Sequence, residues 1–224
     1  IICLVMNGHE PHLLEQILGA KSKVAALRVL INSKIGFSGS SVAKRAGMGL
    51  LAIQNALADL EGLGLVEVER GSVEHRYRLN FKHYMVVHGL RALFEAERGM
   101  VKTLARELRS LLEDQVVSAG LFGSFTQGRA IPGSDIDLLV IVETPKEKER
   151  VSALLSDELP KFSDQYGLPI QPVIYERRRL PNSSGVDELL ETAERDWVMI
   201  TGEDIKRIRA SLIAPKHGTR RRSA

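Results

Sequence analysis

The stretch that decides the fold runs from Val116 to Val142 and reads VVSAGLF, GS, FTQGRAIPGS, DID, LLVIV. Its ends are two apolar, β-branched runs, residues 116–122 and 138–142, and each predicts a buried strand. Between them stand Gly123-Ser124 and, after ten further residues, Asp135-Ile136-Asp137. The predicted order is strand, glycine turn, helix start, loop and strand, with two acids at the mouth of the second strand.

Asp135 and Asp137 are the candidate catalytic and metal-binding residues of this stretch. Alternate residues of a strand share a face, so both carboxylates project to one side and Ile136 to the other. Adjacent carboxylates repel, and hard oxygen ligands of this kind suit Mg²⁺ or Mn²⁺ bridging nucleotide phosphates. The competing interpretation is two edge-strand acids without a role. We disfavour it because charges leading into so apolar a strand cost stability unless something is bound.

Gly123, Ser124, Arg129 and Ser134 are the candidate nucleotide-binding residues. Gly123 lets the backbone approach a phosphate without an intervening Cβ. Ser124, at the expected start of a helix, would add a hydroxyl and helix-terminal N–H groups to a phosphate cradle. Ser134 belongs to the turn that leads into the acids. Arg129 either offsets a phosphate charge or is a solvent-facing loop arginine.

This Gly-Ser to Asp-x-Asp passage resembles the minimal nucleotidyltransferase domain of the DNA polymerase β-like superfamily. The resemblance implies an α/β fold with a short mixed sheet flanked by helices. It also implies Mg²⁺ or Mn²⁺ as cofactor, and transfer of a nucleoside monophosphate from a nucleoside triphosphate, which we expect to be ATP.

The family often has a third carboxylate on a later strand, and here the sequence departs from it. The candidate strand, Leu168–Tyr175, carries Gln171 where an acid is expected, and Glu176 lies just beyond it. The missing acid would be the natural general base for the attacking hydroxyl. Either a small residual activity remains, or the domain has become a nucleotide sensor.

The amino-terminal part, residues 13–80, predicts three short helices followed by a hairpin. Residues 38–46 open on capping serines, and residues 50–63 place apolar side chains at helical spacing before a glycine stop. Two extended runs, residues 65–69 and 75–79, flank a glycine tip. This order resembles a winged helix-turn-helix domain, which implies binding of double-stranded DNA with the third helix in the major groove.

That resemblance implies two kinds of DNA contact. Polar residues of the third helix would face base edges, and basic residues would meet phosphates; they are Gln54 and Asn55, and Lys44, Arg45, Arg70, Arg76 and Arg78. Lys and Arg outnumber Asp and Glu by nine to five between Lys21 and Asn80. The alternative is a winged helix used for dimerisation, because the third helix opens on Leu50-Leu51 rather than on polar residues.

The domain boundaries follow from these patterns. We expect a winged helix domain over residues 1–81, an amphipathic linking helix over 82–114, a nucleotidyltransferase domain over 115–213 and a basic, disordered tail over 214–224. The fold class is α/β (α+β), with helices over residues 146–159 and 186–198 beside the sheet. The linking helix carries an apolar stripe that would allow a homodimer; its residues are Leu90, Leu93, Val101, Leu104, Leu108 and Leu111.

Composition bounds the class of protein. The chain has 44% apolar, 26% charged and 5% aromatic residues, which fits a globular protein and argues against an aromatic platform for single strands. A net charge of +3 mildly favours anionic partners. The single cysteine, Cys3, excludes an internal disulfide. The short apolar start lacks a basic leader, so we expect a cytoplasmic protein without membrane association.

Three functional hypotheses follow. The first is an enzyme that transfers a nucleotide to a protein or nucleic-acid hydroxyl; the basic run Arg177–Arg179 either receives a polyanionic acceptor or is a solvated loop. The second is a DNA-binding regulator whose degenerate domain only senses nucleotide. The third is an assembly module. The two-domain arrangement resembles prokaryotic proteins of which some act as antitoxins by adenylylating a partner protein.

Overall fold

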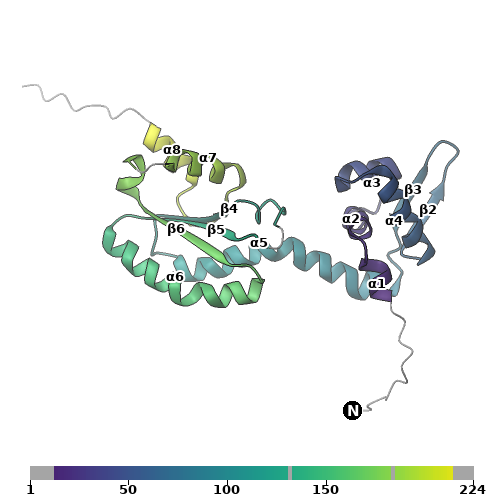
Figure 1. Cartoon of the computed structure of the whole chain (residues 1–224), viewed down its shortest axis with the longest axis horizontal. Helices are drawn as coiled ribbons and strands as arrows, with labels where there is room; N and C mark the ends of the chain where they lie inside the picture. Colours follow the sequence, from purple (N-terminus) through teal and green to yellow (C-terminus); the bar gives the residue numbers. More distant parts are fainter. Residues whose placement is uncertain (1–12, 131–132, 183–184, 214–224) are drawn as a thin grey trace, which may run out of the picture. The chain divides into compact units, whose positions relative to one another are not determined.

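The computed structural model describes residues 13–130, 133–182 and 185–213. The chain divides into two compact units, residues 1–98 and 99–224 (Figure 1). The predictions for Cys3, for the apolar start and for the basic tail lie outside the described residues. No helix within the described ranges is both long and apolar enough to cross a membrane.

The first unit combines four α-helices with a small antiparallel sheet. The helices are α1 (Leu13–Leu18), α2 (Lys21–Leu30), α3 (Gly39–Ala46) and α4 (Leu50–Gly62). The strands are β1 (Phe37–Ser38), β2 (Val66–Arg70) and β3 (His75–Leu79), in the order β1-β3-β2. The helices and the hairpin predicted from the sequence are present, and α1 and β1 add to them.

Local signals explain where α3 and α4 begin and end. The Ser38 hydroxyl accepts a hydrogen bond from the Ser41 amide at 3.4 Å and so caps α3. Gly47 ends that helix in the left-handed conformation, with φ of 63°. On α4 the apolar positions Ile53, Leu57 and Leu60 are fully buried in the core of the unit. This core therefore forms along the face that the helical spacing predicts.

A long helical segment follows the hairpin. It contains a π-helical turn, η1 (Val86–Leu90), and then α5 (Arg91–Leu112). Of the predicted apolar stripe, Leu90, Leu104 and Leu108 are buried, but Leu93 is 53% exposed and Phe94 is buried in its place. A π turn accommodates an extra residue and rotates the following side chains, which accounts for the shift from position 93 to 94.

The second unit is built on a four-stranded mixed sheet. Its strands are β4 (Ser118–Phe122), β5 (Ile136–Val142), β6 (Ile170–Glu176) and β7 (Val198–Gly202), in the order β6-β5-β4-β7. Strands β5 and β6 run parallel, and β4 is antiparallel to both of its neighbours. The short mixed sheet implied by the family resemblance is present, and β7 is a strand that sequence reasoning missed.

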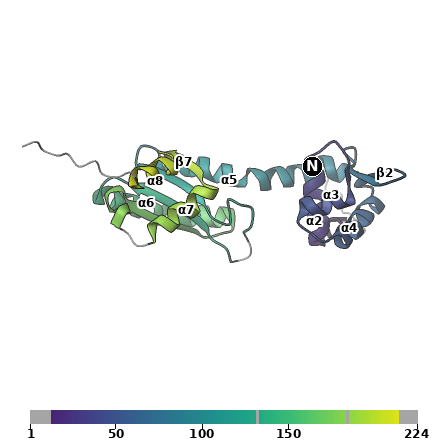
Figure 2. The same ribbon diagram turned by 90° about the horizontal axis from the view of Figure 1, so that it is seen from above.

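Helices cover both faces of this sheet. One face is covered by the carboxyl-terminal part of α5 and by the whole of α6 (Pro145–Tyr166). The other face is covered by α7 (Val186–Asp196) and α8 (Ile205–Ile213) (Figures 1 and 2). Side chains of β5 alternate accordingly, with Leu138 and Val140 toward α6 and Leu139 and Ile141 toward α7. By the same alternation Asp137 lies on the face of α7 and α8.

Helix α6 begins where the sequence predicts and ends later. Thr144 and Glu147 form a reciprocal capping box, and Pro145 occupies the first turn. The helix continues through Pro160 to Tyr166, past the predicted end at Leu159, and stops at Gly167 with φ of 71°. Pro160 is exposed, so its missing N–H removes a helical hydrogen bond where water is accessible. Helix α8 was not predicted, and α7 ends before residue 198.

Candidate functional site

The two acids lie at the start of the central strand β5. Asp135 directly precedes the strand, and Asp137 pairs in register with Phe122 of β4 and Gln171 of β6. Both carboxylate residues are half-buried. The strand pairing places Asp137 between two neighbours rather than at a sheet edge, so its side chain is held by backbone ladders on both sides.

The electrostatic environment of Asp137 is unfavourable for its charge. Burial raises the pKa of the Asp137 carboxyl above its ordinary value, and the negative charge of Asp135 raises it further. No Lys or Arg in the described part of the chain forms an ion pair with either acid. Two neighbouring carboxylates without a counter-charge would be relieved by a bound cation.

Gly123 lies directly against this pair. It follows the last residue of β4 and has φ of 84°, a conformation that side chains other than glycine rarely adopt. A Cβ at this position would overlap with Asp137 Oδ2. Two reasons therefore require glycine at position 123: the backbone conformation of the turn after β4, and the close approach of this backbone to the Asp137 carboxylate.

The segment after Gly123 forms consecutive turns, not the helix expected to start at Ser124. Arg129 N–H donates to the Ser124 carbonyl at 2.9 Å and Gly128 N–H to the Phe125 carbonyl at 3.1 Å. The Thr126 hydroxyl donates to the Gly123 carbonyl at 2.8 Å. The prediction was wrong because the segment contains Gly128, which takes φ of 65° and curls the chain before a second helical turn can form.

A side-chain contact holds the first part of this loop against α7. Gln127 Nε2 donates to Asp196 Oδ2, at the last residue of α7, and Phe125 is buried in the core beneath. Sequence reasoning missed Asp196, since the contact joins residues 69 positions apart and no local motif marks it. The first part of the loop that begins with Gly123-Ser124 is thus held in place by Phe125 and Gln127.

For the other candidate nucleotide-binding residues, no contact with Asp137 like that of Gly123 is described. Ser124 is half-buried at the start of the loop, Arg129 is exposed on it, and Ser134 is half-buried next to Asp135. Residues 131 and 132 lie outside the described ranges. The structure brings Gly123 and Asp137 together and keeps Arg129 at the solvent side, so the roles of Arg129 and Ser134 remain predictions.

The position of the expected third acid is defined by the strand register. Gln171 pairs with Asp137 across the parallel strands β5 and β6, and paired residues of parallel strands face the same side. Glu176 pairs instead with Val142, five residues further on, which is about 16 Å away along the strand. Glu176 therefore does not reach Asp137, and an amide occupies the place of a third carboxylate.

The residues present suit a divalent cation held jointly with a phosphate. Within the described residues there is no group of three or more His, Cys, Asp or Glu that could hold a metal alone. Mg²⁺ commonly takes only one or two carboxylates from the protein and completes its shell with water and substrate phosphate oxygens. The Asp135 and Asp137 pair fits that donor set.

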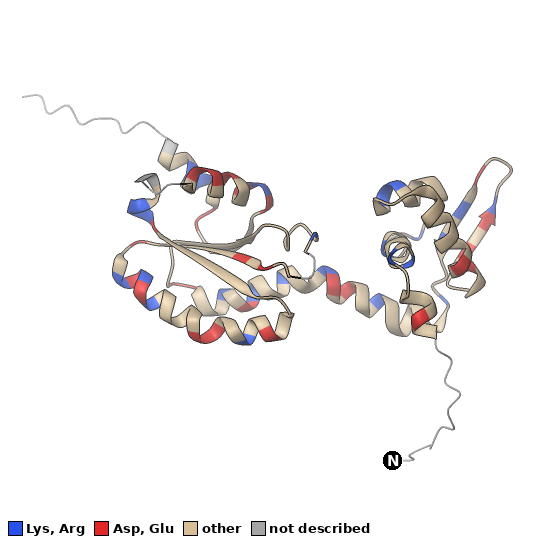
Figure 3. Cartoon of the chain, viewed as in Figure 1, with Lys and Arg blue, Asp and Glu red and all other residues tan. Residues whose placement is uncertain are grey.

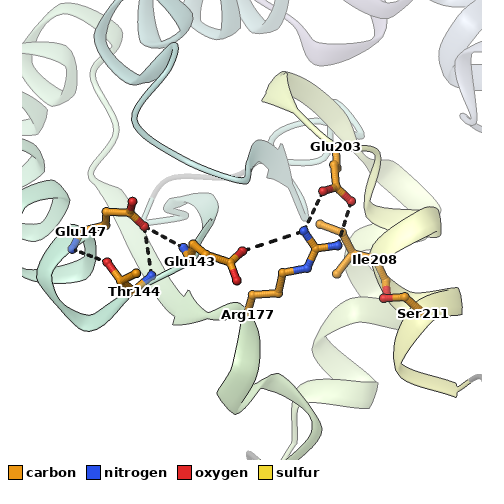
Figure 4. Close-up of polar contacts among 7 residues, drawn as sticks. All are labelled: Glu143, Thr144, Glu147, Arg177, Glu203, Ile208 and Ser211. Carbon is orange, nitrogen blue, oxygen red and sulfur yellow. Dashed lines mark hydrogen bonds and ion pairs between the residues drawn. The ribbon is translucent and has the colours of Figure 1, made fainter. Parts of the chain in front are cut away.

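The opposite end of the sheet holds a network of paired charges (Figure 4). Arg177 donates to both carboxylate oxygens of Glu203, at 2.7 and 3.1 Å, and lies 4.0 Å from Glu143. Arg179 pairs with the buried Glu176 at 2.9 Å. Arg177 and Arg179 thus form ion pairs at the end of the sheet remote from Asp137, a structural role that differs from both interpretations of the run 177–179, the acceptor site and the solvated loop.

The candidate DNA-contacting residues fall into two groups in the first unit. Residues of the helices are accessible: Gln54 and Asn55 are exposed on α4, Lys44 is exposed at the end of α3, and Arg45 stacks over Phe37 at 4.6 Å. The hairpin arginines each pair with an acid, and Figure 3 shows the charges interleaved there. The pairs are Arg70–Glu61 at 2.6 Å, Arg76–Glu74 at 3.8 Å and Arg78–Glu67 at 2.6 Å.

The two leucines at the start of α4 do not contribute to the core. Leu50 is 46% and Leu51 is 71% exposed. Exposed leucines beside Gln54 are available for a partner, as the dimerisation hypothesis requires, and equally for apolar contact with a base methyl group. The exposure thus leaves both interpretations of the first unit as predictions.

Residues 101–195 match the family model described as "Nucleotidyltransferase domain". This region is a nucleotidyltransferase domain. The matched range includes Gly123, both acids and Gln171, while the described helices and hairpin before residue 98 lie outside it.

Two relatives of the nucleotidyltransferase domain come from Methanocaldococcus jannaschii. "Putative protein adenylyltransferase MJ1305" is 40% identical over 68 residues, covering 30% of this chain and 46% of that protein. "Putative protein adenylyltransferase MJ0141" is 29% identical over 93 residues, covering 40% of this chain and 88% of that protein. The chain thus spans less than half the length of the first relative and most of the second.

Among solved structures, "Crystal structure of the toxin-antitoxin with AMP-PNP" is similar over 49% of this chain and 83% of that chain. The sequence identity is 19% and the TM-score 0.34.

Proposed function

We propose that the second unit transfers AMP from ATP to a hydroxyl group of a protein, with Asp135 and Asp137 holding Mg²⁺ or Mn²⁺. The observation that carries the proposal is the uncompensated acid pair seated against the glycine turn at Gly123. The names of the two archaeal relatives support AMP as the group and a protein as the acceptor. Transfer to a nucleic-acid hydroxyl is the alternative within the same chemistry.

The roles of the residues follow from their positions. Asp135 and Asp137 would bind the cation, which when bound neutralises charge gathering on the leaving pyrophosphate. Gly123 allows the triphosphate to approach the backbone, and Ser124 offers a hydroxyl and an N–H to a phosphate oxygen. The acceptor oxygen attacks the α-phosphorus, the bond from that phosphorus to the pyrophosphate oxygen breaks, and the acceptor proton is released.

Gln171 limits the rate in this scheme. Its amide oxygen can accept a hydrogen bond from the acceptor hydroxyl and orient it, but an amide does not take up the proton at neutral pH. Proton release then depends on solvent or on a group of the acceptor itself. Slow transfer with intact nucleotide binding is the expected behaviour.

The test is transfer of label from α-³²P-ATP, with Mn²⁺, to acid-precipitable protein in a cell extract supplied as acceptor. The wild type is expected to label a discrete band, and the Asp135→Ala, Asp137→Ala double variant none. Asp157→Ala, which removes an exposed acid of α6, is the matched control and should label like the wild type. Equal labelling by the wild type and the double variant would exclude the proposed role of the pair.

A second function is proposed for the first unit, namely binding of double-stranded DNA through α3 and α4. The accessible Lys44, Arg45, Gln54 and Asn55 support it. The hairpin arginines are already paired, so we expect them to contribute less than the α3 cations. If Gln171 has removed catalysis altogether, the chain becomes a DNA-binding regulator that senses nucleotide.

The DNA proposal is tested by fluorescence anisotropy with duplex fragments selected from a random library. Binding should weaken steeply with salt, because each phosphate contact releases counterions. Removing Lys44 and Arg45 together should lower the slope of log K against log salt by about two, one for each lost contact. Lys146→Ala, a change of one exposed cation in the second unit, is the control. Duplex binding that does not depend on salt would argue against the DNA proposal.

A further inference from the structure

The two edge strands of the sheet, β7 and β6, differ in how they are protected against pairing with a further strand. Strand β6 carries Pro172, which has no N–H to offer a neighbouring strand. Strand β7 reads Val-Met-Ile-Thr-Gly, without proline or charge, and no strand among the described residues pairs with its outer side. Natural sheets usually protect such an edge with charge, proline or a covering element.

A hollow lies beside β7 on each face of the sheet. On the α5 side it is lined by Val198, Met199 and Ile200 together with the basic side of α5. On the α8 side it is lined by Met199 and Gly202 together with the start of α8. Met199 belongs to both hollows and is 50% exposed. The edge therefore has room for side chains of an added strand above and below the sheet.

The walls of both hollows carry positive charge. Lys102, Arg106 and Arg109 line the first, and Lys206 and Arg207 the second, and all five are exposed. Among them only Arg109 has an acid partner within the described residues, Glu113 at 3.2 Å.

Two acids also line the second hollow. Glu203 is paired with Arg177, whereas Asp204 accepts a hydrogen bond from the Lys206 backbone amide at 2.9 Å and keeps its charge beside Lys206 and Arg207. The net charge presented to an incoming strand is therefore basic on both faces, more strongly on the α5 side, and the apolar residue shared by the two hollows is Met199.

We propose that the outer edge of β7 binds an extended, acid-rich segment of a partner protein as a fifth strand. Backbone hydrogen bonds to β7 would supply affinity, and acidic side chains at successive positions, which face opposite sides of a strand, would enter the two basic hollows. The interaction goes beyond nucleotidyl transfer, because it needs neither nucleotide nor metal.

A second copy of this chain suits the edge less well. A symmetric pair of β7 strands would bring the same five cations of each copy together, and like charges facing one another oppose association. Charge complementarity thus favours a partner rich in Asp and Glu over self-pairing.

The test uses the full chain and two fluorescein-labelled peptides, followed by anisotropy. The Glu-Val peptide repeats Glu-Glu-Val-Val and the Lys-Val peptide repeats Lys-Lys-Val-Val, so that each presents charges on both faces of an added strand. The Glu-Val peptide should bind at least tenfold more tightly than the Lys-Val peptide at low salt. Lys102→Glu with Arg106→Glu, and separately Lys206→Glu with Arg207→Glu, should each weaken binding at least tenfold. Lys146→Glu with Arg150→Glu, which reverses two exposed cations of α6, should leave binding unchanged.

Amide hydrogen exchange distinguishes strand addition from charge attraction alone. Saturation with the Glu-Val peptide should slow exchange within residues 198–202, and unchanged exchange there would overturn the proposal. Equal binding of the two peptides, or insensitivity to both charge reversals, would overturn it as well. So would a dimer seen in sedimentation without peptide that protects the same residues.

The Asp135→Ala, Asp137→Ala variant keeps the two proposals separate. It should bind the Glu-Val peptide as the wild type does, even though it transfers no nucleotide. Loss of peptide binding in that variant would contradict an edge that works independently of the transfer site.

Discussion

The two ends of the central strand β5 differ in whether their acidic side chains have cationic partners. At its start, Asp135 and Asp137 lie together without a cation partner, and burial and mutual repulsion raise the pKa of Asp137. Just beyond its end, Glu143 joins a network in which Arg177 binds Glu203 through two hydrogen bonds. Acids in the same sheet are thus left unneutralised at one end and paired at the other.

Under the proposed function, this difference separates a binding site from a structural contact. Paired charges satisfy each other and need no ligand, whereas like charges held together lower stability until something binds between them. The comparison also shows that a basic run such as 177–179 cannot be interpreted by its residue types alone. Its function depends on whether acids of other elements are within reach.

The largest expected effect comes from neutralising the start of β5. Asp137→Asn should lower the transfer rate by on the order of 10³-fold, because it removes a cation ligand and its charge while preserving shape. The measurement is labelling from α-³²P-ATP under single-turnover conditions. A variant that keeps more than a tenth of the activity would place Asp137 outside the site.

A somewhat smaller loss is expected from Gly123→Ala. The added Cβ would overlap with Asp137 Oδ2, and the backbone there has φ of 84°, so the turn and the carboxylate must both move. We expect about a 10²-fold fall in transfer, since small misplacements of reacting groups have effects of this size. Gly128→Ala is the control, because it shares the positive φ but has open space around it. If Gly123→Ala and Gly128→Ala lost the same amount of transfer activity, backbone strain alone would explain the loss.

Gln171→Glu should act in the opposite direction. It places a carboxylate of nearly the same shape beside Asp137 in the strand register. We expect transfer to rise roughly 10-fold, at the low end of what a positioned general base supplies. The third acid also adds repulsion, so the melting temperature should fall without metal and recover with Mg²⁺. No rise in rate together with no metal-dependent recovery would show that position 171 does not face the site.

At the opposite end of β5, Arg177→Ala should leave transfer within twofold of the wild type. It removes two hydrogen bonds to Glu203 from a side chain that is 33% exposed. A partly exposed bidentate pair of this kind is worth about 1 kcal/mol, or roughly 2–4 °C in melting temperature. Thermal unfolding measures the loss. A large fall in transfer with unchanged stability would show that the two ends are not separate.

The smallest expected effect is the pH dependence of stability at Asp137. Because the folded-state pKa lies above the ordinary 3.8, ionised Asp137 destabilises the fold at neutral pH, and the penalty shrinks as pH falls through the raised pKa. Asp137→Asn should therefore raise the melting temperature at pH 7, on the order of 1–2 °C. The difference from the wild type should disappear below about pH 4. A destabilised variant at pH 7 would contradict the repulsion argument.

Sequence patterns predicted the elements that local signals specify. Apolar runs located β4 and β5, capping residues located the start of α3, and the Asp-x-Asp spacing placed two acids on one face of a strand. The elements that were missed have weak local signals. Strand β7 is five residues long and pairs with β4 across a bulge, and β1 has two residues. Such strands are defined by their partners rather than by their own sequence.

The site was predictable in its residues but not in its surroundings. The register that puts Gln171 beside Asp137, and the contact of Gln127 with Asp196, join positions far apart in sequence, and a single sequence does not reveal such pairings. The loop around Gly128 and Arg129 agrees with the prediction, but the helix expected to start at Ser124 is a series of turns.

The register between β5 and β6 has an evolutionary consequence. Codons for glutamine and glutamate differ by one base, so a lineage can exchange the amide at position 171 for a carboxylate, or the reverse, in a single mutational step. Because the strand pairing is made by backbone atoms, neither exchange disturbs the sheet. Under the proposed mechanism, selection on this one position would change turnover while the architecture is inherited unchanged.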